Sequence, residues 1–175
     1  MSETITGGCL CGAVRYEAEG EPIYAGYCFC GDCRKASGSG FSPFMGFAAS
    51  AVRFSGETRV FTCKAASRGD SDRNFCTVYG GPIFGGIVGQ VEQHTIYAGT
   101  LDDPSRFHPT MAIFNRDRPA WAILPPGLTV SRPCRGDRPP IANRRRLASR
   151  SNYPVTEHSG RTGRPARRRA RTANC

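Results

Sequence analysis

Hydrophobic and polar residues alternate in short runs along this chain as far as Phe114, and turn-forming residues separate the runs. Residues 14–18 show the clearest alternation and lie between Gly12 and Gly20. A period of two bounded by turn residues is typical of a half-buried β-strand. The same criteria predict strands at 23–27, 41–47, 52–54, 59–63, 73–77, 83–84, 94–98 and 111–114.

Helical signals are scarce by comparison. Only residues 102–106 suggest a helical turn, because two aspartates precede an early proline there. The pattern contains no internal repeat. We therefore expect a mainly β fold of short strands.

The size and composition of the chain are consistent with one domain of ordinary length. The chain has 175 residues, of which 39% are hydrophobic, and no apolar run approaches the roughly 18 residues that a membrane span needs. The N-terminus lacks a basic region followed by an apolar one, so we expect no export signal and a cytoplasmic location. Nine cysteines in such a chain favour reduced thiols and metal ligands over a set of disulfides.

The net charge of +10 is confined to the C-terminal part of the chain. Residues 1–131 contain 11 basic and 12 acidic side chains, a net of −1, whereas residues 132–175 contain 13 arginines against Asp137 and Glu157, a net of +11. This second part is rich in Arg, Pro, Ser and Gly and has no useful hydrophobic period. We expect a folded domain at 1–131 and a disordered basic tail at 132–175, which could bind nucleic acid or another polyanion by counterion release.

The strongest chemical signal is the hexapeptide that contains Cys28, Cys30 and Cys33. Its C-x-C-x-x-C spacing allows three thiols on one tight loop to reach a single ion, as in cysteine-ligated zinc sites. Three protein ligands leave one tetrahedral position open, and such a site can bind and polarise a substrate. A disulfide framework or unrelated buried thiols are alternatives. A thioredoxin-like role fits less well, because that motif opens a helix after a strand in an α/β chain.

The cysteines of a second candidate metal site lie before and after the first site in the sequence. Cys9 and Cys11 form a C-x-C between glycines, and Cys76 offers one more thiol far along the chain. A distant C-x-x-C would close such a site, but its last position is Tyr79, whose neutral phenol is a poor substitute for a thiolate. Cys63 or Cys134 could supply the missing ligand, but neither has the expected spacing, so we expect each to be a free thiol.

Four motifs in matching order resemble the glutathione-dependent formaldehyde-activating enzyme family, which includes centromere protein V. They are GCLCGAVRY at 8–16, CFCGDCRKASG at 28–38, FC at 75–76 before Gly80, and GTLDDP at 99–104. The resemblance runs from about Gly7 to Leu128 and does not cover the tail.

This resemblance implies a β-tent fold of short antiparallel strands with two zinc ions. Cys28, Cys30 and Cys33 match the ligands of the family's catalytic zinc, and its structural zinc has matches at Cys9, Cys11 and Cys76. The implied activity is that of a carbon–sulfur lyase, the reversible condensation of formaldehyde with glutathione to S-hydroxymethylglutathione.

Other residues in the sequence raise further expectations. Arg34 and Lys35 are cationic and could hold the carboxylates of a glutathione-like substrate, although a solvated surface pair is the more common role of such residues. Ala112 stands where relatives usually have a histidine, so with Tyr79 it is a departure that could reduce activity. We expect His94 and His108 to be structural.

Two functional hypotheses follow. The first is a zinc-dependent carbon–sulfur lyase that acts on adducts of a small-molecule thiol and an aldehyde, with no membrane partner. The second is a non-catalytic or degenerate zinc-binding module whose basic tail binds a polyanion.

Overall fold

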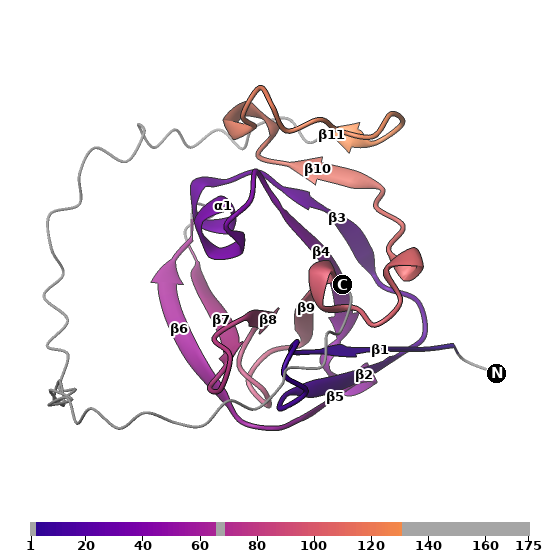
Figure 1. Cartoon of the computed structure of the whole chain (residues 1–175). Helices are drawn as coiled ribbons and strands as arrows, with labels where there is room; N and C mark the ends of the chain where they lie inside the picture. The colour runs from indigo at the N-terminus through magenta and orange to yellow at the C-terminus, as the bar shows by residue number, and fades with distance from the viewer. Residues whose placement is uncertain (1–2, 66–68, 131–175) are drawn as a thin grey trace, which may run out of the picture. The chain divides into compact units, whose positions relative to one another are not determined.

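The computed structural model describes residues 3–65 and 69–130, which form two β-sheets and one α-helix (Figure 1). The helix is α1 (Gly31–Ser37). Short 3-10 turns lie at η1 (Ala49–Ala51), η2 (Ala98–Thr100), η3 (Pro104–Arg106) and η4 (Asn115–Asp117). The strands are β1 (Thr4–Gly8), β2 (Arg15–Glu19), β3 (Tyr24–Cys28), β4 (Ser42–Ala48), β5 (Val52–Ser55), β6 (Thr58–Lys64), β7 (Asp70–Cys76), β8 (Pro82–Gly85), β9 (Gln93–Tyr97), β10 (Met111–Ile113) and β11 (Thr129–Val130).

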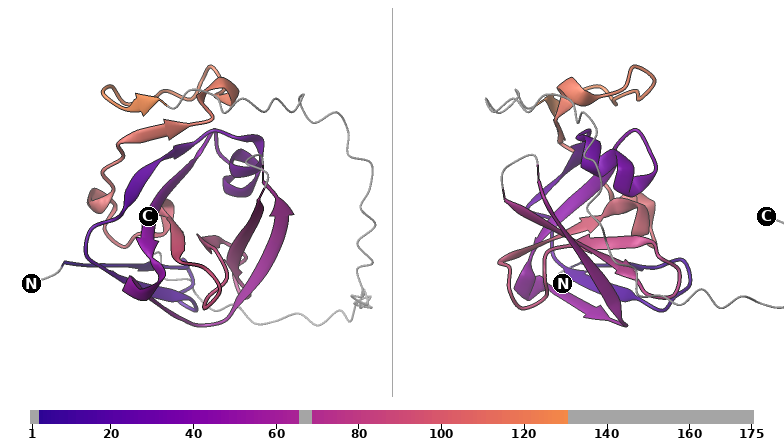
Figure 2. Two further views of the ribbon diagram at one scale, coloured as in Figure 1. Left: turned by 180° about the vertical axis from the view of Figure 1, so that it is seen from behind. Right: turned by 90° about the vertical axis from the view of Figure 1, so that its left-hand side faces the viewer.

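The smaller sheet has the order β1-β2-β5 and is antiparallel. The larger sheet has the order β11-β10-β3-β4-β9-β8-β7-β6, and only the β10 pairings with β3 and β11 are parallel. The views in Figure 2 show the smaller sheet against one end of the larger one. The mainly β class expected from the sequence is confirmed, and each predicted strand overlaps an observed one.

The main hydrophobic core lies between the two sheets because the alternating strands turn one face towards each other. In β1 and β2 every second side chain is buried, as the sequence period predicts. The smaller sheet contributes Tyr16, Ala18 and Val52 to the same cluster that contains Met45 and Phe84 from the larger sheet. This packing holds β7 and β9, which border the candidate site described below.

His94 belongs to this core, as expected for a structural histidine. It is buried, its Nδ1 lies 3.2 Å from the Gly85 carbonyl oxygen, and its ring meets those of Phe54 and Phe84 edge-on. Burial lowers the pKa of His94, which keeps the imidazole neutral. His108 belongs to neither of the cysteine groups that could hold a metal ion in the described residues.

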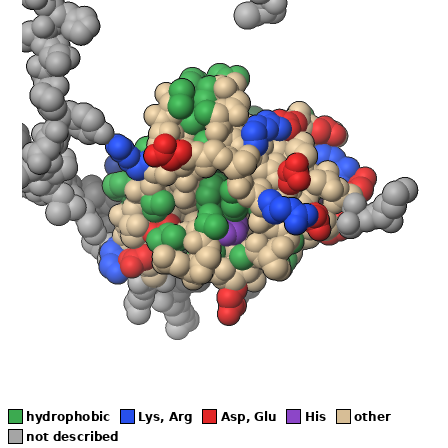
Figure 3. Space-filling model, turned by 90° about the horizontal axis from the view of Figure 1, so that it is seen from below, with side chains coloured by type: hydrophobic (Ala, Val, Ile, Leu, Met, Phe, Trp, Pro, Cys, Tyr) green, Lys and Arg blue, Asp and Glu red, His purple; other side chains and the backbone are tan. Residues whose placement is uncertain are grey.

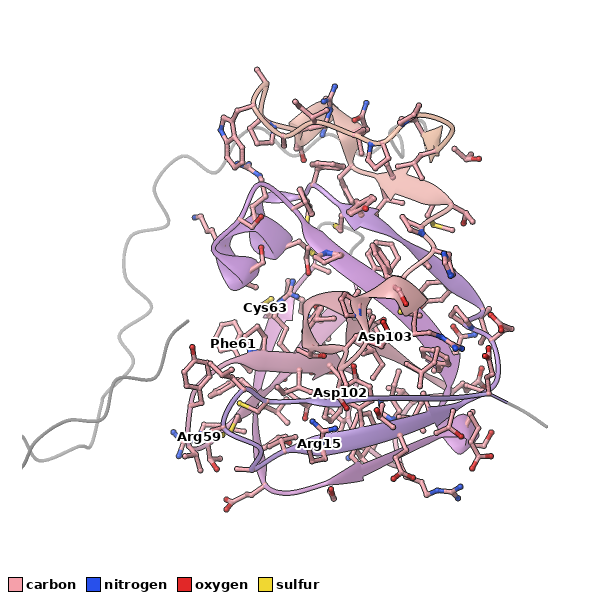
Figure 4. All side chains as sticks on the ribbon, turned by 45° about the vertical axis from the view of Figure 1, so that its right-hand side comes forward. Arg15, Arg59, Phe61, Cys63, Asp102 and Asp103 are labelled. Atoms are coloured by element: carbon pink, nitrogen blue, oxygen red, sulfur yellow. The ribbon has the colours of Figure 1, made fainter. Side chains whose placement is uncertain are left out.

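The predicted helical turn at 102–106 is confirmed as η3, with its two aspartates in separate roles. Asp103 caps the turn by accepting a hydrogen bond from the Ser105 amide at 2.9 Å. Asp102 instead accepts from Nη1 of Arg15 at 2.9 Å, and this ion pair lowers the pKa of Asp102 (Figure 4). The contact ties the loop after β9 to the smaller sheet.

The surface on the side of the smaller sheet carries acidic and basic side chains interspersed (Figure 3). Several of them are paired across elements, including Arg106 with Glu3 at 2.6 Å and Arg53 with Glu19. Mixed charge agrees with the small net charge of this part of the sequence. No helix within the described residues is long and apolar enough to cross a lipid bilayer.

The expectation of a single helical turn was wrong, because α1 follows β3 directly. The stretch 31–37 has no apolar stripe, and its cap is the thiol of Cys30, which accepts from the Cys33 amide at 3.4 Å in place of a Ser, Thr, Asp or Asn side chain. Gly38 ends the helix in the left-handed region at φ 64°. The sequence also gave no sign of β1 or β11. The predicted tail at 132–175 lies outside the described residues.

Gly26 allows β3 and β10 to approach closely, and a substitution there tests this contact. A Cβ on Gly26 would lie 2.5 Å from the Met111 carbonyl oxygen, so Gly26→Ala should destabilise the fold by about 1–3 kcal/mol. Gly99→Ala is the matched control, because no atom lies within 4 Å of its Cβ position. Urea unfolding midpoints measure both. Equal midpoints for the two variants would contradict the close approach.

Candidate functional site

Three thiols converge where β3 passes into α1. Cys28 ends the strand, Cys30 caps the helix and Cys33 lies in its first turn, so one short segment carries all three. Their Sγ atoms lie within 4.8 Å of one another. Cys28 and Cys30 are buried, and Cys33 is half-buried. We call this group the first thiol cluster.

The electrostatics of the first thiol cluster favour a bound cation. Hydrogen bonds from the Cys28 and Cys33 thiols, together with backbone amides at the helix start, lower the pKa of Cys30 to about 2. The same contacts raise the pKa of Cys28, because a second thiolate beside the first would be repelled. Three ionised thiols at this spacing need a positive ion between them. The all-sulfur donor set fits a metal ion that binds thiolates.

A cleft of about 570 Å³ opens beside the first thiol cluster, and Cys28 and Cys33 line it. Its walls come mainly from β3, β4, β7, β9 and β10 of the larger sheet and from the loop after β8. A cleft of this size can enclose much of a small organic ligand. The remaining lining residues include Tyr24, Ser42, Phe44, Asp70, Ser71, Asp72, Arg73, Thr95, Tyr97, Met111 and Ile113.

Arg73 supplies the cationic side chain of this cleft. Its Nη1 donates to the Tyr97 hydroxyl at 2.8 Å, and its Nη2 lies 3.8 Å from Sγ of Cys33. Burial raises the pKa of the Tyr97 phenol, so the phenol stays protonated at neutral pH. The guanidinium therefore lies between a thiol of the first cluster and a proton-bearing hydroxyl.

The sequence gave no reason to select Arg73. It occupies one position in a predicted strand, where charged side chains usually face solvent, and its contacts join three separate segments of the chain. Only the arrangement of α1, β7 and β9 reveals it. The one signal in the sequence was the presence of a charged residue within a predicted strand.

Arg34 and Lys35, the two cations selected from the sequence, lie outside the cleft. Arg34 donates from Nε to the Phe29 carbonyl oxygen at 3.1 Å, which braces the loop that carries Cys28 and Cys30. Lys35 is exposed on α1. Neither residue is among those that line the cleft.

Ala112 lies on the opposite face of β10 from the cleft. Met111 and Ile113 line the cleft, whereas the intervening Ala112 is fully buried against Phe29 and Ala122. A side chain at 112 is therefore part of the packing behind the strand. Proton transfer inside the cleft depends on other groups.

A second thiol cluster joins the turn after β1 to the end of β7. Sγ of Cys11 lies 3.5 Å from Sγ of Cys9 and 3.5 Å from Sγ of Cys76, although Cys76 is remote in sequence. Cys9 and Cys76 are buried and Cys11 is exposed. The donors are again three thiols, which fit a thiolate-binding metal ion. Tyr79 is 60% exposed at the edge of this group.

Cys63 is too far away to complete the second thiol cluster. It lies on β6 (Figure 4), five residues from Thr58. Thr58 is the residue that pairs with Cys76. At about 3.3 Å per residue the separation along the strand is roughly 16 Å. The alternative that Cys63 is the fourth ligand is therefore wrong, and Cys134 lies outside the described residues.

The C-x-x-C pair does open a helix after a strand, contrary to the argument used against a thioredoxin-like role. The surrounding sheet differs from an α/β fold, because β3 is antiparallel to β4, the next strand in sequence. Cys28 adds a third thiol beside the pair. The arrangement corresponds to a three-thiol site.

The chain was compared with known proteins. A search of curated proteins found no match. Among solved structures, the chain is similar to a crystal structure of a Rhodobacter sphaeroides protein, with 22% sequence identity and a TM-score of 0.42 over 55% of this chain and 87% of that one. The sequence profile of the glutathione-dependent formaldehyde-activating enzymes matches residues 4–117, which is more than half of the 175 residues and contains both thiol clusters. The chain therefore belongs to the glutathione-dependent formaldehyde-activating enzyme family.

Proposed function

We propose that this protein is a zinc-dependent carbon–sulfur lyase that forms and cleaves adducts between a thiol and an aldehyde. Glutathione and formaldehyde are the proposed pair, with S-hydroxymethylglutathione as the adduct. The observation that carries the proposal is the first thiol cluster at the wall of the cleft, with Arg73 beside it. Membership of the family supports the choice of substrates.

The proposal assigns one zinc ion to Cys28, Cys30 and Cys33 and a second to Cys9, Cys11 and Cys76. It also takes the two sheets as a β-tent fold and residues 1–131 as the part that carries activity. When bound to three thiolates, a zinc ion supplies Lewis acidity that favours the thiolate form of a substrate thiol and polarises an aldehyde oxygen.

The reaction requires one new bond and one net proton transfer. A bond forms between the thiol sulfur and the aldehyde carbon, the carbonyl π bond breaks, and the proton lost from sulfur is balanced by one gained at oxygen. Tyr97 is placed to donate the proton to that oxygen, because its hydroxyl faces the cleft and accepts a hydrogen bond from Arg73. The reverse reaction returns the proton to Tyr97.

Arg73 has the chemistry to hold an anionic group of the substrate. Glutathione carries carboxylates, and a guanidinium in a partly water-excluded cleft binds a carboxylate more strongly than one at the surface. Arg73 is half-buried and its Tyr97 contact uses Nη1, so its orientation is fixed before substrate binds.

The first test measures adduct formation directly. The zinc-loaded full chain should accelerate exchange between formaldehyde, glutathione and their adduct, as followed by exchange NMR, because the cluster activates the thiol. Cys28→Ser should return the exchange rate to that of the uncatalysed reaction, whereas Cys63→Ser, which removes a thiol outside both clusters, should keep the acceleration. A folded, zinc-loaded wild type without acceleration would support the non-catalytic zinc module instead.

The second test counts the metal ions. Elemental analysis of the full chain should give about two zinc ions per molecule, and Cys28→Ser/Cys30→Ser/Cys33→Ser should give about one, since each cluster offers three thiolates. The unfolding midpoint of the variant checks that it is folded. A folded wild type without zinc would refute both assignments.

The third test compares the cations. Arg73→Ala should raise KM for glutathione by about 10–100-fold, which corresponds to the loss of a charge-assisted hydrogen bond of about 1.5–3 kcal/mol. Lys35→Ala tests the contact expected from the sequence and should leave KM near the wild-type value, because Lys35 does not line the cleft. A large change for Lys35→Ala with none for Arg73→Ala would contradict the proposed role of Arg73.

A further inference from the structure

The turn that follows Cys76 is shaped around its sulfur atom. The amides of Val78 and Tyr79 point to Sγ of Cys76 at 3.4 and 3.5 Å, and the Gly80 amide donates to the Cys76 carbonyl oxygen at 2.9 Å. Gly80 permits this turn at φ 84°. The backbone of residue 79 therefore lies beside the second thiol cluster. A short side chain at this residue could reach an ion held by the cluster.

Tyr79 does not use this position to provide a fourth donor. Its side chain is largely exposed, and its Cδ1 lies 3.3 Å from the point that a Cβ on Gly81 would occupy. A neutral phenol is also a weak ligand compared with three thiolates. Among the His, Cys, Asp and Glu side chains of residues 3–65 and 69–130, the group at this place consists of Cys9, Cys11 and Cys76.

The surroundings leave the fourth direction open to solution. Cys11 is exposed, and the residues next to the thiols are exposed too, with Leu10 at 82% and Val78 at 74%. The other two thiols are buried in the core between the sheets, so they are held in place by packing. The cluster thus combines a rigid buried side with an accessible one.

We propose that the second thiol cluster holds a metal ion with an open coordination position, and that this position binds a small thiol from solution. A thiol is the expected ligand because an ion that selects three soft sulfur donors also prefers sulfur at the fourth position. The exposed side chains of Leu10 and Val78 can contact the aliphatic part of such a thiol. This inference rests on metal binding at the cluster and is independent of catalysis at the first one.

Cobalt(II) provides a direct readout, since the visible absorption of this ion responds to each sulfur ligand. The cobalt-loaded full chain is titrated with 2-mercaptoethanol, which is not the proposed substrate. The wild type should show a larger saturable shift of the cobalt bands than Tyr79→Cys, because the new thiol closes the second site. Both proteins share the first thiol cluster, so the difference between their responses belongs to the second.

Thr77→Cys is the matched control for adding a thiol to this turn. The Thr77 hydroxyl donates to the Glu57 carbonyl oxygen at 3.4 Å, so its side chain points away from Cys76 and a cysteine there should preserve the wild-type response. Tyr79→Phe should also preserve it, because the phenol is not a ligand.

Three results would overturn the inference. Equal responses of the wild type and Tyr79→Cys would show that the fourth position is not open to solution thiols. A changed cobalt spectrum in Tyr79→Phe before any thiol is added would make the phenol a ligand. A changed spectrum in Cys134→Ser/Cys175→Ser would mean that a thiol of the tail fills the position. Metal analysis of each variant confirms that both clusters are loaded.

Discussion

The candidate site depends on how strand β3 is held. β4 pairs with it antiparallel on one side and β10 pairs with it parallel on the other, so Cys28 is fixed opposite both Ser42 and Ile113. Gly26 makes this close packing possible, because Met111 occupies the space that a side chain would need. A strand fixed on both edges gives the first thiol cluster a rigid base. The rest of that cluster follows within one helical turn.

Burial then determines what the thiols can do. Three sulfur atoms within 4.8 Å cannot all carry negative charge without a cation. Hydrogen bonds between the thiols raise the pKa of Cys28 and lower that of Cys30, so the cluster holds its charge on one sulfur. A metal ion would resolve the conflict by replacing the protons that Cys28 and Cys33 carry, because Cys30 is already ionised. The arrangement of the three sulfurs therefore suits a bound metal ion.

The sequence predicted the parts of the molecule that local patterns encode. Alternation located the strands, and the two cysteine motifs contained the residues that the structure brings together. It failed at α1, because a seven-residue helix capped by a thiol shows none of the usual capping or apolar signals. It also failed at Arg73, whose importance comes from contacts with Cys33 and Tyr97 on other elements. Spacing along the chain reveals ligands on one loop, whereas tertiary packing decides which cation faces them.

The two thiol clusters have the same three-sulfur donor set, but the residues that surround them differ. The first borders a cleft with Arg73 and Tyr97 on its wall, so a ligand that reaches it is held by groups able to bind an anion and donate a proton. The second borders solvent beside Leu10 and Val78, with no such partner among the described residues that contact its sulfurs. A metal ion bound to three thiolates would supply the same polarisation in both places, so the neighbouring side chains would account for any difference in chemistry. Strand β7 connects the two clusters, since Arg73 and Cys76 are three residues apart on it.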